Sequence, residues 1–200
     1  MVNQKVKVKD NHARKRKFLK WFLILLGIVI LLATAYFLGF FSSKPLQITI
    51  EHPMKGIIIS NTNEAGEVNG QAVLEKGILE FNEDYIIYLL VSLGANNLHK
   101  SYVGYGNAEV DLIIDEETWS AIISDSLKVS RGVSGDPDLR ISMSREEAVR
   151  ALLSANVQDY MKNSVNNGDT KLEQISNKVE LGSKGYLAMY TSITGEVIAE

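Results

Sequence analysis

The side chains in this sequence that are suited to metal binding or acid–base catalysis do not have the spacing of a known site. It has no cysteine, which excludes a disulfide, a thiolate metal site and a cysteine nucleophile. The histidines, at positions 12, 52 and 99, lack a second ligand at the helix or strand spacing of a zinc site, and we interpret His52 as the exposed end of a strand. Three groups of acids fit turns and first helical turns better than a calcium loop: residues 115–117, residues 136 and 138, and residues 146 and 147.

The segment Tyr102–Gly106, YVGYG, is similar to the filter sequence of potassium channels. A filter requires a re-entrant loop between two membrane spans, and this segment lies far beyond the only long apolar run. We therefore interpret it as a turn before a strand. The sequence also contains no G-x-S-x-G and no phosphate-binding loop, so it predicts no catalytic residue, no metal and no cofactor.

The apolar run near the N-terminus indicates a membrane span. No charged residue occurs between Trp21 and Ser43, and these 23 residues would form a helix of roughly 34 Å, enough to cross a hydrocarbon layer of ~30 Å. We predict a transmembrane helix over residues 18–41, with a basic tail of residues 1–17 before it and a linker of residues 42–45 after it.

A cleavable signal peptide is the alternative, because Ala33-Thr34-Ala35 matches the A-x-A pattern of a cleavage site. The apolar run continues six residues past Ala35, to Phe41, and this continuation favours an uncleaved anchor.

Charge predicts the orientation of this span. The first twenty residues contain eight Lys or Arg and one acid, whereas residues 44–200 contain thirteen Lys or Arg and twenty-three Asp or Glu. Because basic flanks remain in the cytoplasm, we predict a cytoplasmic N-terminus and an extracytoplasmic domain, residues 46–200, at a cell membrane. The basic tail fits contact with anionic lipids rather than nucleic acid, so we expect the lipid bilayer as its partner.

The segments that follow the span predict an α+β domain. Alternation and β-branched runs predict strands near residues 46–52, 56–60 and 72–81. An apolar run lies between Asn82, a suitable helix N-cap, and Gly94, a residue typical of the position after a helix C-terminus, and this favours a helix. A buried strand is the alternative, because every face of this segment is apolar.

The second half of the domain changes from strand to helix at Ser144. Alternating segments predict strands over residues 108–115, 118–125, 126–131 and 138–143. Ser144 and Glu147 form a capping box, and helical spacing of apolar residues from Val149 to Met161 predicts one long helix over the sheet. Residues 186–193 predict a short closing helix. The predicted class is a mostly antiparallel sheet with helices on one face, preceded by one transmembrane helix.

Three of these segments, within residues 83–193, resemble the sterol carrier protein type two family: DLRISMSREEAVRALL, AEVDLIIDEETWSAII and NKVELGSKGYLAMY. Domains of that family have a five-stranded sheet covered on one side by helices, with an apolar tunnel between the two layers. The resemblance implies that this chain has the same fold, attached to a single-pass anchor, and that the segment NKVEL forms its last strand. It also implies that the domain binds a lipid or another apolar ligand.

The resemblance also implies a set of pocket-lining residues, which are Val149, Leu152, Leu153, Tyr160, Tyr186, Leu187 and Met189. A filled core is the alternative for the same residues, because an amphipathic face buries itself in any domain. We therefore expect a non-catalytic domain that binds lipid or another apolar molecule outside the membrane. The alternative function is an accessory interaction domain of an envelope complex, with a solid core.

The orientation of the span can be tested with a reporter that works only in the cytoplasm. Fused after Glu200, it should be inactive in intact cells, because the basic N-terminus stays inside. The same reporter fused before Met1 should be active. The reverse pattern would contradict the predicted orientation.

Overall fold

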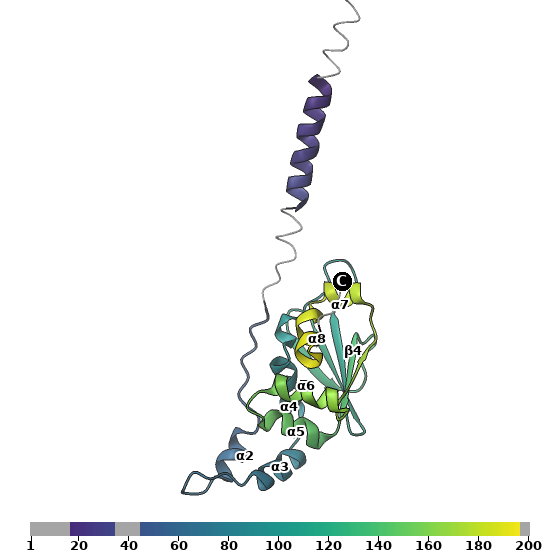
Figure 1. The fold of residues 1–200 in the computed structure, drawn as a ribbon. Coiled ribbons are helices and arrows are strands. Elements are labelled where there is room, and N and C mark those ends of the chain that lie inside the picture. Colours follow the sequence, from purple (N-terminus) through teal and green to yellow (C-terminus); the bar gives the residue numbers. More distant parts are fainter. Residues whose placement is uncertain (1–16, 35–44, 197–200) are drawn as a thin grey trace, which may run out of the picture. The chain divides into compact units, whose positions relative to one another are not determined.

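The computed structural model describes residues 17–34 and 45–196, which belong to two separate units, Met1–Ser43 and Lys44–Glu200. In the first unit, Lys17–Thr34 is a helix of mean hydropathy 2.1 that is long and apolar enough to cross a membrane (Figure 1). The rest of the predicted span and most of the predicted tail and linker, residues 1–16 and 35–44, lie outside the described residues.

The second unit contains a five-stranded sheet with the strand order β3-β2-β1-β4-β5. Its strands are β1 Ala108–Ile114, β2 Glu117–Ile123, β3 Leu127–Arg131, β4 Leu139–Met143 and β5 Lys171–Gln174. The pairs β1–β2, β2–β3 and β4–β5 are antiparallel, whereas β1 and β4 are parallel. The strands predicted between residues 108 and 143 are confirmed. Three of the four pairings are antiparallel, as expected of a mostly antiparallel sheet, and the parallel pair makes the sheet mixed.

One face of the sheet is covered by helices. Trp119, Leu112, Ile141 and Leu172 lie in register across four strands and form one apolar row on this face. The helices that share this core include α4 Glu83–Ser92, α5 Arg145–Leu153, α6 Val157–Asn167 and α8 Tyr186–Thr194. Figure 1 shows α6 and α8 in front of the sheet.

The opposite face is covered in part by the loop of residues 132–138, which carries the chain from β3 to β4. The backbone N–H of Ser134 donates to Asp111 Oδ1 at 3.0 Å, and that of Asp136 donates to Glu109 Oε2 at 3.3 Å. Asp111 is fully buried beneath this loop.

The three strands predicted before residue 82 are wrong. Residues 55–60 form α2 (Lys55–Ser60), and residues 70–79 form α3 (Gly70–Leu79). Residues 45–52 show the predicted alternation of burial, but no described strand pairs with them.

The apolar positions in α3 have helical rather than strand spacing. Val73, Leu74 and Gly77 are its buried residues, and the Asn69 side chain caps the helix by accepting from the backbone N–H of Ala72 at 3.2 Å. The run of isoleucines in α2 favours a strand locally, but a helix buries Ile57 in the shared core, and this tertiary contact overrides the local preference.

The single long helix predicted after Ser144 is two helices, α5 and α6. The side chain of Asn156 starts the second by accepting from the N–H groups of Gln158 at 3.0 Å and Asp159 at 3.3 Å. The segment NKVEL, expected as the last strand, is helical, because Asn177 caps α7 (Lys178–Ser183) by accepting from the N–H of Glu180.

Two further helix predictions are confirmed. Helix α4 starts at Asn82, whose side chain accepts from the N–H of Asp84 at 2.9 Å, and is followed by Gly94 in the left-handed conformation at φ 98°. The predicted closing helix is α8, which ends before Gly195.

The Ser144 side of the predicted capping box is also confirmed, because Ser144 Oγ accepts from the N–H of Glu147 at 3.1 Å, whereas the Glu147 carboxylate accepts from the hydroxyl of Tyr160. Replacing Ser144 with Ala should lower the free energy of unfolding by ~1 kcal/mol, since one N–H of α5 loses its partner. Denaturant unfolding measures this change. Ser192→Ala is a suitable control, because the Ser192 hydroxyl bonds within an exposed turn of α8. Equal losses in the two variants would contradict the role of the cap.

Candidate functional site

The seven predicted pocket residues occupy three environments. Val149, Leu152, Tyr186 and Met189 are buried in the shared core, Leu153 and Tyr160 are half-buried, and Leu187 is exposed. Packing around Val149 is close, because a methyl group added at Gly77 would lie 2.8 Å from Val149 Cγ1. The structure thus brings only Leu153 and Tyr160 together at one hollow of the surface.

That hollow is a groove of about 500 Å³ where α3, α5 and α6 meet; we call it the α3–α5–α6 groove. Its lining residues are Gly70, Gln71, Leu74, Arg150, Leu153, Ser154 and Tyr160. Leu74, Leu153 and the ring of Tyr160 supply apolar surface, and the other side chains supply donors and acceptors. Small-molecule sites have this mixture and commonly occupy roughly 300–1,000 Å³.

The break between α5 and α6 shapes the groove. Ser154, in extended conformation, ends α5, and its hydroxyl donates to the carbonyl of Ala151 at 2.6 Å. In one continuous helix, Leu153 and Tyr160 would lie two turns apart along a single ridge. The break redirects α6, so that these two side chains and Leu74 of α3 border the same hollow.

Arg150 and Tyr160 at the groove donate hydrogen bonds to neighbouring acids. Arg150 donates from Nε and Nη2 to Glu146 Oε1 at 2.9 and 2.7 Å. The hydroxyl of Tyr160 donates to Glu147 Oε2 at 3.1 Å, and burial together with the charge of Glu147 raises the pKa of Tyr160 to about 12. Tyr160 therefore stays neutral at physiological pH. The groove offers hydrogen bonds and apolar contact to a ligand but no group suited to proton transfer near neutral pH.

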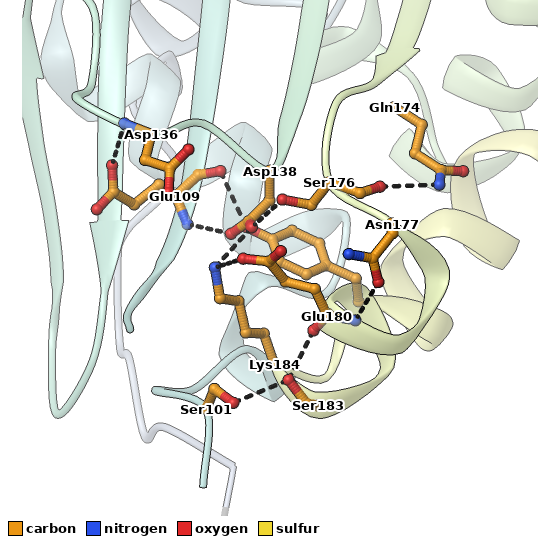
Figure 2. Close-up of polar contacts among 11 residues, drawn as sticks. Ser101, Glu109, Asp136, Asp138, Gln174, Ser176, Asn177, Glu180, Ser183 and Lys184 are labelled. Atoms are coloured by element: carbon orange, nitrogen blue, oxygen red, sulfur yellow. Dashed lines mark hydrogen bonds and ion pairs between the residues drawn. The ribbon is translucent and has the colours of Figure 1, made fainter. Parts of the chain in front are cut away.

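A second polar feature is the Asp138 cluster, which consists of Asp138, Ser176, Glu180, Lys184 and Tyr186 (Figure 2). Asp138 Oδ1 accepts from Lys184 Nζ at 2.6 Å and from Ser176 Oγ at 2.8 Å. Asp138 Oδ2 accepts from the Tyr186 hydroxyl at 3.0 Å and from a backbone N–H of β1 at 2.8 Å. The cluster joins the sheet to α7 and α8.

The geometry of the Asp138 cluster indicates a structural role. Burial opposes the charge on Lys184, but its hydrogen bonds to the carboxylates of Asp138 and Glu180 outweigh burial and raise the pKa of Lys184. Burial, followed by the charge of Asp138, raises the pKa of Tyr186 well above its ordinary value. Asp138 is 0% exposed and Lys184 is 1% exposed, so a substrate in solution cannot reach either group.

His52 connects the extended segment of residues 45–52 to α5. Its Nε2 donates to the carbonyl of Leu152 at 2.9 Å, its Nδ1 accepts from the N–H of Met54 at 3.2 Å, and its ring lies 4.8 Å from that of Tyr88. The interpretation of His52 as an exposed strand end is therefore wrong. Within residues 17–34 and 45–196, no group of three or more His, Cys, Asp or Glu side chains could hold a metal ion.

The sequence predictions missed two parts of these sites. On the α3 side of the groove, Leu74 was assigned to a strand over residues 72–81, and Gly70 and Gln71 were placed before it, although the spacing of buried residues in this segment is helical. Asp138 and Lys184 are 46 residues apart, and no local pattern marks them as a pair.

Thirteen chains of solved structures match this chain, and three of them are described here, whereas no protein-family model and no curated protein matches it. A structure described as UbiJ-SCP2 ubiquinone synthesis protein has 10% identity and a TM-score of 0.31, covering 71% of this chain and 96% of its own. A solution structure of palmitated sterol carrier protein 2 like 2 from Aedes aegypti has 20% identity and a TM-score of 0.31, covering 53% and 89%. A crystal structure of the latter protein has 18% identity and a TM-score of 0.28, covering 49% and 86%.

The descriptions of these three structures place them in the sterol carrier protein family, which is also the family that the sequence resembles. With TM-scores of 0.28 to 0.31, the likeness carries no argument about activity or ligand.

The raised pKa values in the Asp138 cluster predict alkaline destabilisation. Because the pKa values of Lys184 and Tyr186 in the folded chain exceed their ordinary values of 10.5 and 10.0, the unfolded chain loses these protons first. The stability that the protonated forms of these two groups contribute to the fold is complete below about pH 10 and is lost as the pH rises further. Above pH 10, the free energy of unfolding should fall less steeply with pH in Tyr186→Phe than in the wild type. The two slopes should differ by up to about 1.4 kcal/mol per pH unit.

Denaturant unfolding at pH 8 to 11 measures these slopes. Thr191→Val, on the same helix, removes no titrating group and should keep the wild-type slope. A wild-type slope in Tyr186→Phe would show that Tyr186 does not contribute to it.

Proposed function

We propose that this chain is a membrane-anchored, non-catalytic protein that binds a lipid or another amphiphilic molecule in the α3–α5–α6 groove, on the extracytoplasmic side of a cell membrane. The observation that carries the proposal is the groove itself. It combines the apolar surface of Leu74, Leu153 and Tyr160 with the polar groups of Gln71, Arg150 and Ser154 in about 500 Å³. A molecule with an apolar chain and a hydrogen-bonding head group matches both surfaces.

The N-terminal segment supports the membrane anchor. Helix Lys17–Thr34 has the length and apolarity of a span, and the basic residues that precede and begin it contrast with the acidic composition of residues 44–200. The excess of basic residues on one flank favours a cytoplasmic N-terminus. A lipid-binding domain on such an anchor has its ligand source close by.

A non-catalytic function agrees with the chemistry of the groove. Its titratable side chains are Arg150, which bonds to Glu146, and Tyr160, whose pKa is about 12. Neither group is suited to acid–base catalysis near pH 7, because a catalytic pKa lies near the working pH.

Photolabelling tests the proposed ligand site. The full chain in lipid nanodiscs is exposed to a fatty-acid analogue with a diazirine on its chain, and the labelled peptides are identified by mass spectrometry. Labelling should saturate and concentrate on residues 70–74 and 150–160. In Gly70→Trp, where a Cβ meets no atom within 4 Å, the indole should occupy the groove without disturbing the core, and apparent affinity should fall at least ~10-fold.

Gly182→Trp is the matched control, because a Cβ at Gly182 in α7 also meets no atom within 4 Å and Gly182 does not line the groove. It should keep wild-type labelling. Non-saturable labelling, or labelling that is unaffected by Gly70→Trp, would contradict this site. That result would favour the alternative function, an accessory interaction domain with a solid core that contacts another envelope protein.

A further inference from the structure

Exposed apolar side chains gather around the junction between α7 and α8. In the loop of residues 99–106, Tyr102 is 41%, Val103 55% and Tyr105 42% exposed. Val179 of α7 and Leu187 of α8 are 69% and 47% exposed. We call these five residues the docking surface.

Hydrogen bonds bring the two parts of the docking surface together. The backbone N–H of His99 donates to the carbonyl of Lys184 at 3.1 Å, and the hydroxyls of Ser101 and Ser183 are 2.9 Å apart. The loop thus packs on the residues that connect α7 to α8, and the Asp138 cluster fixes these residues to the sheet.

The loop that carries the aromatic residues has a defined shape. The N–H of Ser101 donates to the carbonyl of Gly106 at 2.8 Å, and the N–H of Val103 donates to Ser101 Oγ at 3.2 Å. Gly104 and Gly106 have φ values of 98° and 83°, which allow the chain to turn within a few residues. The loop therefore presents Val103 and the two tyrosines on a constrained turn.

The charge around the docking surface differs from that of the rest of the domain. Residues 96–107 contain Lys100 and no acid, and the nearest acid of α7, Glu180, accepts a hydrogen bond from the buried Lys184. Lys100 and Lys178 are exposed in this region, whereas residues 44–200 as a whole contain thirteen Lys or Arg and twenty-three Asp or Glu. Apolar side chains with lysines and few acids complement an anionic lipid surface.

The chain also joins the domain beside this surface. The N–H of Leu46 donates to the carbonyl of Asn96 at 2.7 Å, just before the loop of residues 99–106. Ten residues separate Thr34 from Pro45, and even fully extended they cover no more than about 40 Å. A bilayer that holds Lys17–Thr34 is therefore within reach of the docking surface.

We propose that the docking surface binds the anionic lipid bilayer in which the chain is anchored and so fixes the orientation of the domain. The tyrosine rings lie at the level of the head groups, and Val103 and Leu187 reach the start of the acyl chains. Within the domain, α3 and α5 lie at the opposite end from α7, so docking leaves the α3–α5–α6 groove uncovered (Figure 1). This inference rests on the anchor of the proposed function and is independent of a ligand in the groove.

Depth-dependent fluorescence quenching tests the docking surface. Because the chain contains no cysteine, single-cysteine variants of the full chain can be labelled uniquely with an environment-sensitive fluorophore. Val103→Cys and Leu187→Cys report from two segments of the surface. Leu79→Cys in α3 and Val133→Cys, at positions 82% and 71% exposed, are controls outside it. The labelled chains are placed in nanodiscs that contain anionic lipids and brominated acyl chains.

Quenching at positions 103 and 187 should be several-fold stronger than at positions 79 and 133, and it should weaken when the anionic lipids are replaced by zwitterionic ones. Adding Lys100→Glu and Tyr105→Ser to Leu187→Cys should reduce quenching at position 187. Equal quenching at all four positions would overturn the proposal. Absence of quenching at position 103 because a second copy of the chain covers it would also overturn the proposal. A negative quenching result would not change the photolabelling of the groove, and a negative photolabelling result would not change the quenching. The two experiments therefore test the two proposals separately.

Discussion

The fold depends on a buried carboxylate that is fully paired. An isolated charge in a protein interior costs several kcal/mol, and removing one member of a buried ion pair commonly costs 3–5 kcal/mol. Asp138 avoids this cost because a lysine, a tyrosine, a serine and a backbone N–H all donate to it. These donors come from β1, from the segment after β5 and from the α7–α8 region, so the charge can be buried only when the sheet and the C-terminal helices are assembled together.

The Asp138 cluster also determines which surfaces remain for binding. It fixes Lys184 and Tyr186, and through them the junction on which the loop of residues 99–106 packs. The α7–α8 end presents exposed apolar side chains and lysines. The α3–α5–α6 groove lies at the other end of the domain, where helices pack on helices and the chain breaks at Ser154. The proposed bilayer-docking surface and the proposed ligand groove therefore lie at different ends of the domain.

Of the residues expected to line a pocket, those that face the sheet fill the core, and those near the helix break border a groove. Leu152 is buried, and Val149 is buried where α3 packs closely on α5, because a Cβ at Gly77 would lie 2.8 Å from Val149 Cγ1. Leu153 is one position further around α5 and reaches the surface. Helical periodicity identifies an apolar face, but neighbouring elements decide which of its members touch solvent.

The sequence by itself determined the features that depend on nearby residues. An uncharged run specifies the apolar helix, because a charge is costly in hydrocarbon; alternation specifies β1 to β4; and short-range capping by Asn82 and Ser144 marks the starts of α4 and α5. Only the tertiary structure decided the parallel pairing of β1 and β4, the helical state of α2, and the pairing of Asp138 with Lys184 across 46 residues. The physical reason is that these features gain their stability from contacts between distant segments, and such contacts leave no pattern in a local stretch of sequence.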